Sequence, residues 1–418
     1  MGGLVHRSIK RFFSPLRGNL LALTLSITLW LFPHMMVTPY ESLYFLALGG
    51  SGALLGLMNT VQSMLGIGLK FSGGSIADRR GRKKVIGIVT IMLSFFYFFY
   101  IFARSWVWVF IGASLLSLRS LYTPALQAIR ADSVKPRERG RGFIFFSVLP
   151  RIPAIIAPAL GGMLMVDLAS NYGISLEGVR LGFILVFIGA FSAGLVRLTF
   201  LEETLEKRRH GHDSAKKGLK TFLREWCDAI ASSKSDIKRL ILLNGFFMFC
   251  FHFDPLFRDV YAVKIKSIPA DQWGIIVSIA QAFMIVAALV MGGLIDRYGS
   301  KHVFVPSVFF LGLANLMFIL GETFTSILLS MVIINTFQMT RMMSFQVLMA
   351  DSTPREIRGR VFSIIEIFGN IGWSISYMLS GILFDMSPTL PFIVSVVTYS
   401  MATLVGLFFI REAEVKYE

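Results

Sequence analysis

Cysteine and charged residues are scarce in this chain of 418 residues. The two cysteines, Cys227 and Cys250, cannot form a disulfide framework and lack metal-ligand spacing. Only 16% of the residues are charged, whereas 55% are hydrophobic, which indicates an integral membrane protein. The sequence also lacks a phosphate-binding glycine loop, an HExxH motif and a Gly-x-Ser-x-Gly motif. We therefore expect no enzyme, no cofactor and no metal site.

Apolar runs of about 20 residues recur along the chain, which is the length that crosses a bilayer as a helix. They predict twelve transmembrane helices, at about 19–39, 52–77, 85–103, 106–129, 142–166, 180–201, 239–262, 273–295, 303–320, 326–349, 361–384 and 391–410. The predicted fold class is thus an all-α polytopic membrane protein. Residues 202–238 form the only long polar stretch, and within it Leu219, Phe222 and Trp226 share a helical face that predicts an amphipathic helix.

Two charged sequence motifs each occur twice. Residues 131–141 read ADSVKPRERGR and residues 350–360 read ADSTPREIRGR; GGSIADRRGRKK begins at Gly73 and GGLIDRYGSK at Gly292. Asp351 follows Asp132 by 219 residues, and Asp296 follows Asp78 by 218. The chain is therefore a tandem duplication with six spans in each half, which is typical of secondary transporters. We expect two pseudo-symmetric six-helix bundles, at 19–201 and 239–410, joined by the loop 202–238.

Lysine and arginine are concentrated in the loops after even-numbered spans and in the tails 1–18 and 411–418, and they account for a net charge of +16. The opposite ends of the spans carry only Arg104, Arg180, Lys264 and Lys266. By the positive-inside rule both termini are cytoplasmic and the location is the cell membrane. The charge therefore indicates contact with membrane lipid rather than nucleic acid.

The first of these loops resembles the signature of the major facilitator superfamily, through Gly74, Asp78, Arg79, Gly81, Arg82 and Lys83. A weaker copy consists of Gly293, Asp296, Arg297, Gly299 and Lys301. The resemblance implies two bundles with a substrate site between them and transport by alternating access. In span five, Ala157, Pro158, Gly161 and Gly162 partly match the motif of the family's proton antiporters.

The charged loops suggest a gating latch. Asp78 ends span two and can dock on the free amides at the start of span eleven, near Val361, with Arg82 orienting it. Asp132 and Asp351 lie in the other pair of repeated loops, which follow spans four and ten. Because Ser300 replaces Arg82 in the second copy, we expect the latch of Asp296, Arg297 and Gly299 to be weaker.

Charged residues deep in a membrane are costly and are therefore functional candidates. Arg119, Arg151 and Arg341 fall near the middle of their spans, against the two acids Asp254 and Glu366. Glu366 is the first candidate for proton coupling, since desolvation favours a neutral carboxyl group. The expected substrate-binding residues are the three arginines together with Asn335 and Gln338 of span ten and Asn370, Trp373 and Tyr377 of span eleven.

The surplus of deep arginine favours an anionic substrate, because a guanidinium donates bidentate hydrogen bonds to carboxylate or phosphate. We therefore expect a monomeric, proton-coupled transporter of a small solute. Two alternatives stay open: a proton-antiporting exporter of amphipathic drug-like compounds, and a non-transporting receptor or lipid scramblase with the same fold. Gly112 occupies the place of an arginine that the family's drug exporters carry in span four, which disfavours the first alternative.

Overall fold

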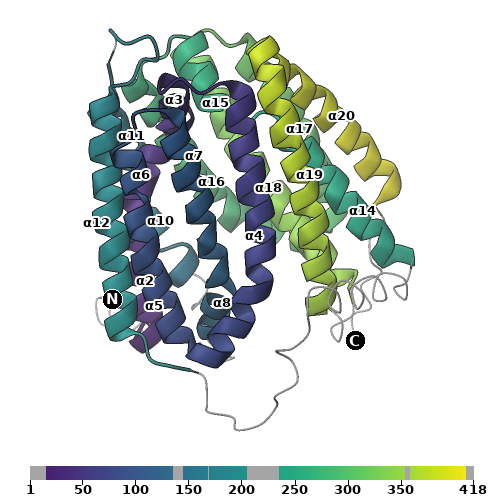
Figure 1. Ribbon diagram of the computed structural model, residues 1–418. Helices are drawn as coiled ribbons and strands as arrows, with labels where there is room; N and C mark the ends of the chain where they lie inside the picture. The colour runs from purple at the N-terminus through teal and green to yellow at the C-terminus, as the bar shows by residue number, and fades with distance from the viewer. Residues whose placement is uncertain (1–15, 135–144, 168, 205–234, 354–357, 411–418) are drawn as a thin grey trace, which may run out of the picture. The chain divides into compact units, whose positions relative to one another are not determined.

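The computed structural model describes residues 16–134, 145–167, 169–204, 235–353 and 358–410; for residues 71–80, 131, 235–237 and 358–360 it describes the backbone alone. The described chain is helical (Figure 1), with one isolated β-bridge between Val166 and Ile174. The expected amphipathic helix and both tails fall largely outside the described residues.

The chain divides into two compact units. Unit 1 comprises Met1–Gly49 and Leu65–His210, and unit 2 comprises Gly50–Met64 and Gly211–Glu418. Helix α4 (Gly52–Arg80) contributes to both, with its first turns in unit 2. The bundle boundaries expected from the sequence stay a prediction.

Unit 1 is built from α2 (Gly18–Val37), η1 (Thr38–Tyr40), α3 (Glu41–Ala47), α5 (Arg82–Phe96), α6 (Phe98–Ile101), α7 (Trp106–Leu116), η2 (Ser117–Leu121), α8 (Thr123–Asp132), α10 (Arg151–Ala154), α11 (Ala157–Met165) and α12 (Leu176–Phe200). Helix α12 packs along α2 and α5 (Figure 1). Leu23, Ile86 and Ile129 form part of the buried core between α2, α5 and α8, and no side chain of the three is accessible to solvent. Their burial supplies the apolar packing that holds these helices together.

Unit 2 contains α14 (Ser235–Cys250), α15 (Arg258–Val260), η4 (Tyr261–Ile265), α16 (Ala270–Tyr298), α17 (Ser300–Leu320), α18 (Phe324–Asp351), α19 (Arg358–Met386) and α20 (Leu390–Phe409). Helix α18 packs against α16 and α17, and α14 against α19. The rings of Phe247, Phe304 and Phe345 meet at centroid distances of 5.2–5.7 Å and join α14, α17 and α18.

The helices confirm the repeat that the sequence predicts. Helix α4 begins at Gly52 and α16 at Ala270, α5 at Arg82 and α17 at Ser300, and α7 at Trp106 and α18 at Phe324. Each pair of starting residues is 218 positions apart, which is the spacing of Asp78 and Asp296. The two units thus repeat one order of helices.

Ten helical segments of the described chain are long and apolar enough to cross a membrane, namely 18–47, 52–70, 82–101, 106–130, 145–165, 176–200, 270–298, 300–320, 361–386 and 390–409. The other two expected spans correspond to α14 with α15 and η4, and to α18. Helix α14 stops at Cys250, and α18 carries Asn335, Gln338 and Arg341, which lower its hydropathy. Expected span four is also interrupted, by the 3₁₀ turn η2.

Candidate functional site

The loop after α4 turns sharply at Gly81, whose φ of 89° is favourable for glycine alone. A Cβ atom here would also lie 2.8 Å from Oε2 of Glu203. The turn starts α5 with Arg82, which forms an ion pair of 2.6 Å with Asp132 at the end of α8. These two residues of the expected latch therefore meet. The side chains of Asp78 and Arg79, like the environment of Gly74, lie outside the described part.

The second copy keeps the turn but loses the ion pair. Gly299 has a φ of 85° and starts α17 with Ser300, which is buried and has no charge to offer. Asp296, Arg297 and Asp351 are exposed, and none of the three forms an ion pair with a described residue. The guanidinium of Arg297 instead lies 5.3 Å from the ring centroid of Tyr298. The asymmetry of the two loops thus appears in their geometry, whereas docking of either on its partner helix stays a prediction.

A cluster of three charged side chains, which we call the nest, is buried in unit 2 where the chain leaves the helix after Cys250. Asp254 is fully buried and pairs with Arg258, whose Nε donates to Oδ2 of Asp254 over 2.7 Å. Arg341 enters from α18 and is 7% exposed. It interacts electrostatically with Asp254, Arg258 and Tyr399. The nest therefore holds two cations and one carboxylate, and of the two only Arg258 forms an ion pair with Asp254.

Hydrogen bonding within the nest is incomplete. The Cζ atom of Arg341 lies 4.0 Å from the ring centroid of Phe251, a cation–π contact. Neither Nε of Arg341 nor Oδ1 of Asp254 has a hydrogen-bond partner among the described residues, although both atoms are buried. A buried polar group without a partner is unfavourable. The nest therefore has unused capacity to bind a proton or an anion.

Three aromatic rings form a cluster: one comes from the stretch after Cys250 and two come from the middle of α19. His252 stacks on Trp373 with ring centroids 4.5 Å apart, and Tyr377 meets both rings at 5.6–5.9 Å. This cluster places Trp373 and Tyr377 together, as the sequence predicts for one face of the helix.

Two of the three amides expected to bind substrate donate hydrogen bonds to carbonyl groups of their own helices. Asn335 Nδ2 donates to Met331 O and Asn370 Nδ2 to Glu366 O. Gln338 is half-buried and Glu366 is exposed on its helix. No hydrogen bond among the described residues links Asn335, Gln338 or Asn370 to Arg341.

Arg119 and Arg151 belong to unit 1, where both are exposed. Arg119 lies in the 3₁₀ turn η2, and Arg151 starts α10 directly after Pro150. Within the described chain neither guanidinium forms an ion pair. Arg119 interacts electrostatically with His34 and Glu41.

Two residues of unit 1 were not expected at a site. His34 stacks on Trp30 at 4.6 Å, and Glu41 Oε1 accepts a hydrogen bond of 3.0 Å from Tyr100. His252 follows His34 by 218 residues, and each histidine stacks on a tryptophan. The repeat spacing, applied to single polar residues inside spans one and seven, would have identified both histidines.

A search with family profiles matches the Major Facilitator Superfamily over residues 20–264 and 254–418. The chain belongs to the Major Facilitator Superfamily. It is therefore a multi-pass membrane transporter of that family, with the two-domain fold that its helices indicate.

Among relatives of this superfamily member, a Na(+), Li(+), K(+)/H(+) antiporter of Planococcus maritimus is 23% identical over 81% of this chain and 82% of its own. A class H tetracycline resistance protein of Pasteurella multocida is 26% identical over 35% of this chain and 36% of its own. A mutant of the nucleoside transporter NupG has a similar fold, with a TM-score of 0.71 and 17% identity over 93% of this chain and 98% of that one.

Gly161 of span five has a packing role in this superfamily member. A Cβ atom on Gly161 would collide with the carbonyl group of Met36 on α2. Gly161 therefore permits the close contact between α11 and α2, as small residues do in membrane helices. The partial antiporter motif thus has a structural explanation here.

Proposed function

We propose that this transporter carries a small anion, organic or inorganic, and couples its movement to protons. The observation that supports the proposal most is Arg341, a buried cation with an unpartnered Nε. A cation held away from water without a full set of partners is unfavourable. A carboxylate or phosphate that binds there would remove the penalty and accept the two parallel hydrogen bonds that a guanidinium offers.

The arginines of unit 1 support the same class of substrate. Arg119 and Arg151 are exposed on their unit and form no ion pair with a described residue. Both are positions at which we propose contact with an anion. Asn335, Gln338, Asn370, Trp373 and Tyr377 complete the proposed substrate-binding set.

Asp254 offers a route to coupling. In the nest it neutralises one of two cations, Arg258 and Arg341. If Asp254 takes up a proton, Arg258 loses its counter-ion and the nest becomes more positive. Proton binding then strengthens anion binding, and by linkage the anion strengthens proton binding to the same extent. Glu366 is the second proposed coupling residue. The antiporter relative, by its name, also exchanges protons and so supports coupling.

A second candidate function is export of amphipathic drug-like compounds. The aromatic cluster of His252, Trp373 and Tyr377 favours it, because flat apolar ligands stack on such rings. The tetracycline resistance relative supports it over about a third of the chain.

For gating we propose that the loop at Gly81, held by the ion pair between Arg82 and Asp132, closes one side of the transporter. The ion pair holds α5 to α8, so the loop is a rigid base for Asp78. We further propose bundles at 19–201 and 239–410, a monomer in the cell membrane, and both termini in the cytoplasm.

Ligand protection of the purified protein tests the substrate class. Small carboxylates or phosphates should raise its unfolding temperature, whereas lipophilic cations should not. Arg341→Lys keeps the charge but loses the planar fork, and should remove most of the protection. Arg17→Lys, which alters an exposed arginine of unit 1 far from the nest in sequence, is the matched control. Protection by lipophilic cations alone would replace the anion with the drug-like class.

Flux in proteoliposomes tests the transport function itself. An imposed pH gradient should drive uptake of the protecting anion. If no anion, cation or drug-like compound moves, the non-transporting alternative takes the place of this proposal.

A further inference from the structure

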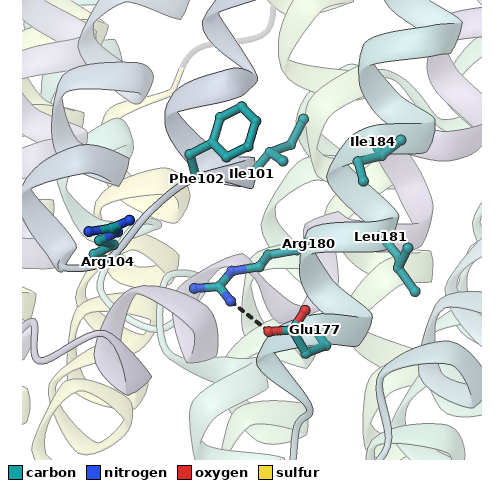
Figure 2. Close-up of a pocket in the computed structure, with 7 residues that line it drawn as sticks. All are labelled: Ile101, Phe102, Arg104, Glu177, Arg180, Leu181 and Ile184. Carbon is teal, nitrogen blue, oxygen red and sulfur yellow. Dashed lines mark hydrogen bonds and ion pairs between the residues drawn. The ribbon is translucent and has the colours of Figure 1, made fainter.

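A groove of about 340 Å³ opens in unit 1 between the end of α6 and the first turns of α12 (Figure 2). Ile101, Phe102 and Arg104 form one wall, and Glu177, Arg180 and Leu181 belong to the other. In the view of Figure 2 the charged side chains lie toward one side and the apolar ones toward the other. The groove therefore has a polar end and an apolar end. It has no part in the proposed transport site.

Arg180 is fixed at the polar end by two contacts. Its two terminal nitrogens donate to Glu177 Oε1 over 2.7 Å and to the carbonyl oxygen of Ala103 over 2.9 Å. Its Nε is buried and has no hydrogen-bond partner among the described residues. These contacts place a guanidinium at the edge of the groove.

Arg104 supplies the second cation. It is exposed, and no described residue forms an ion pair with it. Because Glu177 offsets only one of the two arginines, the polar end keeps one positive charge. It therefore attracts an anion rather than a neutral or zwitterionic group.

The apolar end consists of side chains that face outward from the unit. Phe102 is 63% exposed and Leu181 is 51% exposed. The groove also lies at the edge of the apolar layer, since the span that contains α6 ends at Ile101 and that of α12 begins at Leu176. At that depth a bilayer changes from acyl chains to headgroups.

We propose that this groove binds one anionic phospholipid, with its phosphate on Arg104 and Arg180 and an acyl chain along Phe102 and Leu181. A soluble phosphate would fill the polar end alone and leave these apolar side chains in water. A lipid satisfies both ends of the groove at once.

Titration of the purified full-length protein tests the site. Short-chain phosphatidylglycerol should raise the unfolding temperature more than phosphatidylcholine with the same chains. Arg104→Gln should weaken the apparent affinity for phosphatidylglycerol about fivefold, the effect of one arginine near a membrane surface. Arg104→Lys should retain most of it. Lys264→Gln, which removes an exposed cation from unit 2, is the matched control and should have no effect.

Two further arms decide between a lipid and a free anion. Glycerol 3-phosphate has the charge but no acyl chain. Because small phosphates should also protect through Arg341, it is tested on the Arg341→Lys variant, which it should not protect at the same concentration. Leu181→Asn should weaken protection by phosphatidylglycerol. The lipid assignment is overturned if glycerol 3-phosphate protects the Arg341→Lys variant as well as phosphatidylglycerol does, or if Arg104→Gln binds phosphatidylglycerol as the unaltered protein does. The unfolding temperature without lipid shows whether each variant is folded.

Discussion

Replacing Arg341 by methionine should stop transport but leave the protein about as stable as before. The substitution removes a cation–π contact with Phe251, worth about 2 kcal/mol when desolvated. It also removes a buried charge whose Nε has no partner, which relieves about 1–3 kcal/mol. The two effects nearly cancel, so we expect a change in the free energy of unfolding within about 1 kcal/mol.

Arg197 provides a matched comparison, because it is also buried but its Nε donates a hydrogen bond. It is 4% exposed, and it donates to Ser26 Oγ over 3.1 Å and to Thr90 Oγ1 over 2.9 Å. Hydrogen bonds from a charged donor are worth about 1.5–3 kcal/mol each, so at the lower figure the loss of both makes Arg197→Met cost about 3 kcal/mol. The Arg197 variant should therefore lose stability, whereas the Arg341 variant should keep its stability and lose transport.

Thermal unfolding in detergent and flux in proteoliposomes check the pair. For units of this size about 1 kcal/mol corresponds to roughly 2–4 °C. Arg197→Met should therefore lower the unfolding temperature by roughly 6–12 °C, and Arg341→Met should change it by no more than about 4 °C while transport is lost. The reasoning is refuted if the two variants lose the same stability, or if Arg341→Met still transports.

Asp78→Asn should greatly reduce flux with little loss of expression and Asp296→Asn should reduce it less, because only the first loop has the ion pair; equal flux in the two variants would contradict the latch. Glu366→Gln should abolish the response of transport to an imposed pH gradient while exchange persists, and a response like that of the unaltered protein would exclude Glu366 as the coupling residue. Gly299→Ala should lower stability by about 1–2 kcal/mol in thermal unfolding, because its φ is 85°. Gly292→Ala is its control and should be neutral or stabilising, since no atom lies within 4 Å of its Cβ position; a similar loss in both would show that the turn is not strained.

Much of the fold was predictable because the signals are local or periodic. Apolar runs predicted where helices cross the membrane, and ten of them appear in the described chain as helical segments long and apolar enough to do so. The repeat of charged words predicted paired helix starts such as Arg82 and Ser300. Glycine after Asp-Arg-x predicted a tight turn, which Gly81 and Gly299 form with positive φ. Each of these depends on a few neighbouring residues or on one fixed spacing.

The break in the helix after Cys250 was harder to predict from the sequence. The sequence predicts one span at 239–262, although Asp254, Pro255 and Arg258 fall inside it and weaken the helix there. In the structure the chain leaves the helix and buries Asp254 against Arg258. The ion pair between Asp254 and Arg258 satisfies the two charges only in part. Arg341 of α18 and Tyr399 of α20 complete their surroundings.

The partners of buried arginines were decided by the tertiary structure alone. In the sequence Arg197 and Arg341 look alike, each a single cation in an apolar run. Packing gives Arg197 hydroxyl partners from α2 and α5, which are 171 and 107 residues away along the chain. Packing gives Arg341 the face of Phe251 and leaves its Nε without a hydrogen bond to any described residue. Hydropathy depends on a residue and its neighbours, whereas satisfaction of a buried charge depends on which distant helices fold against it.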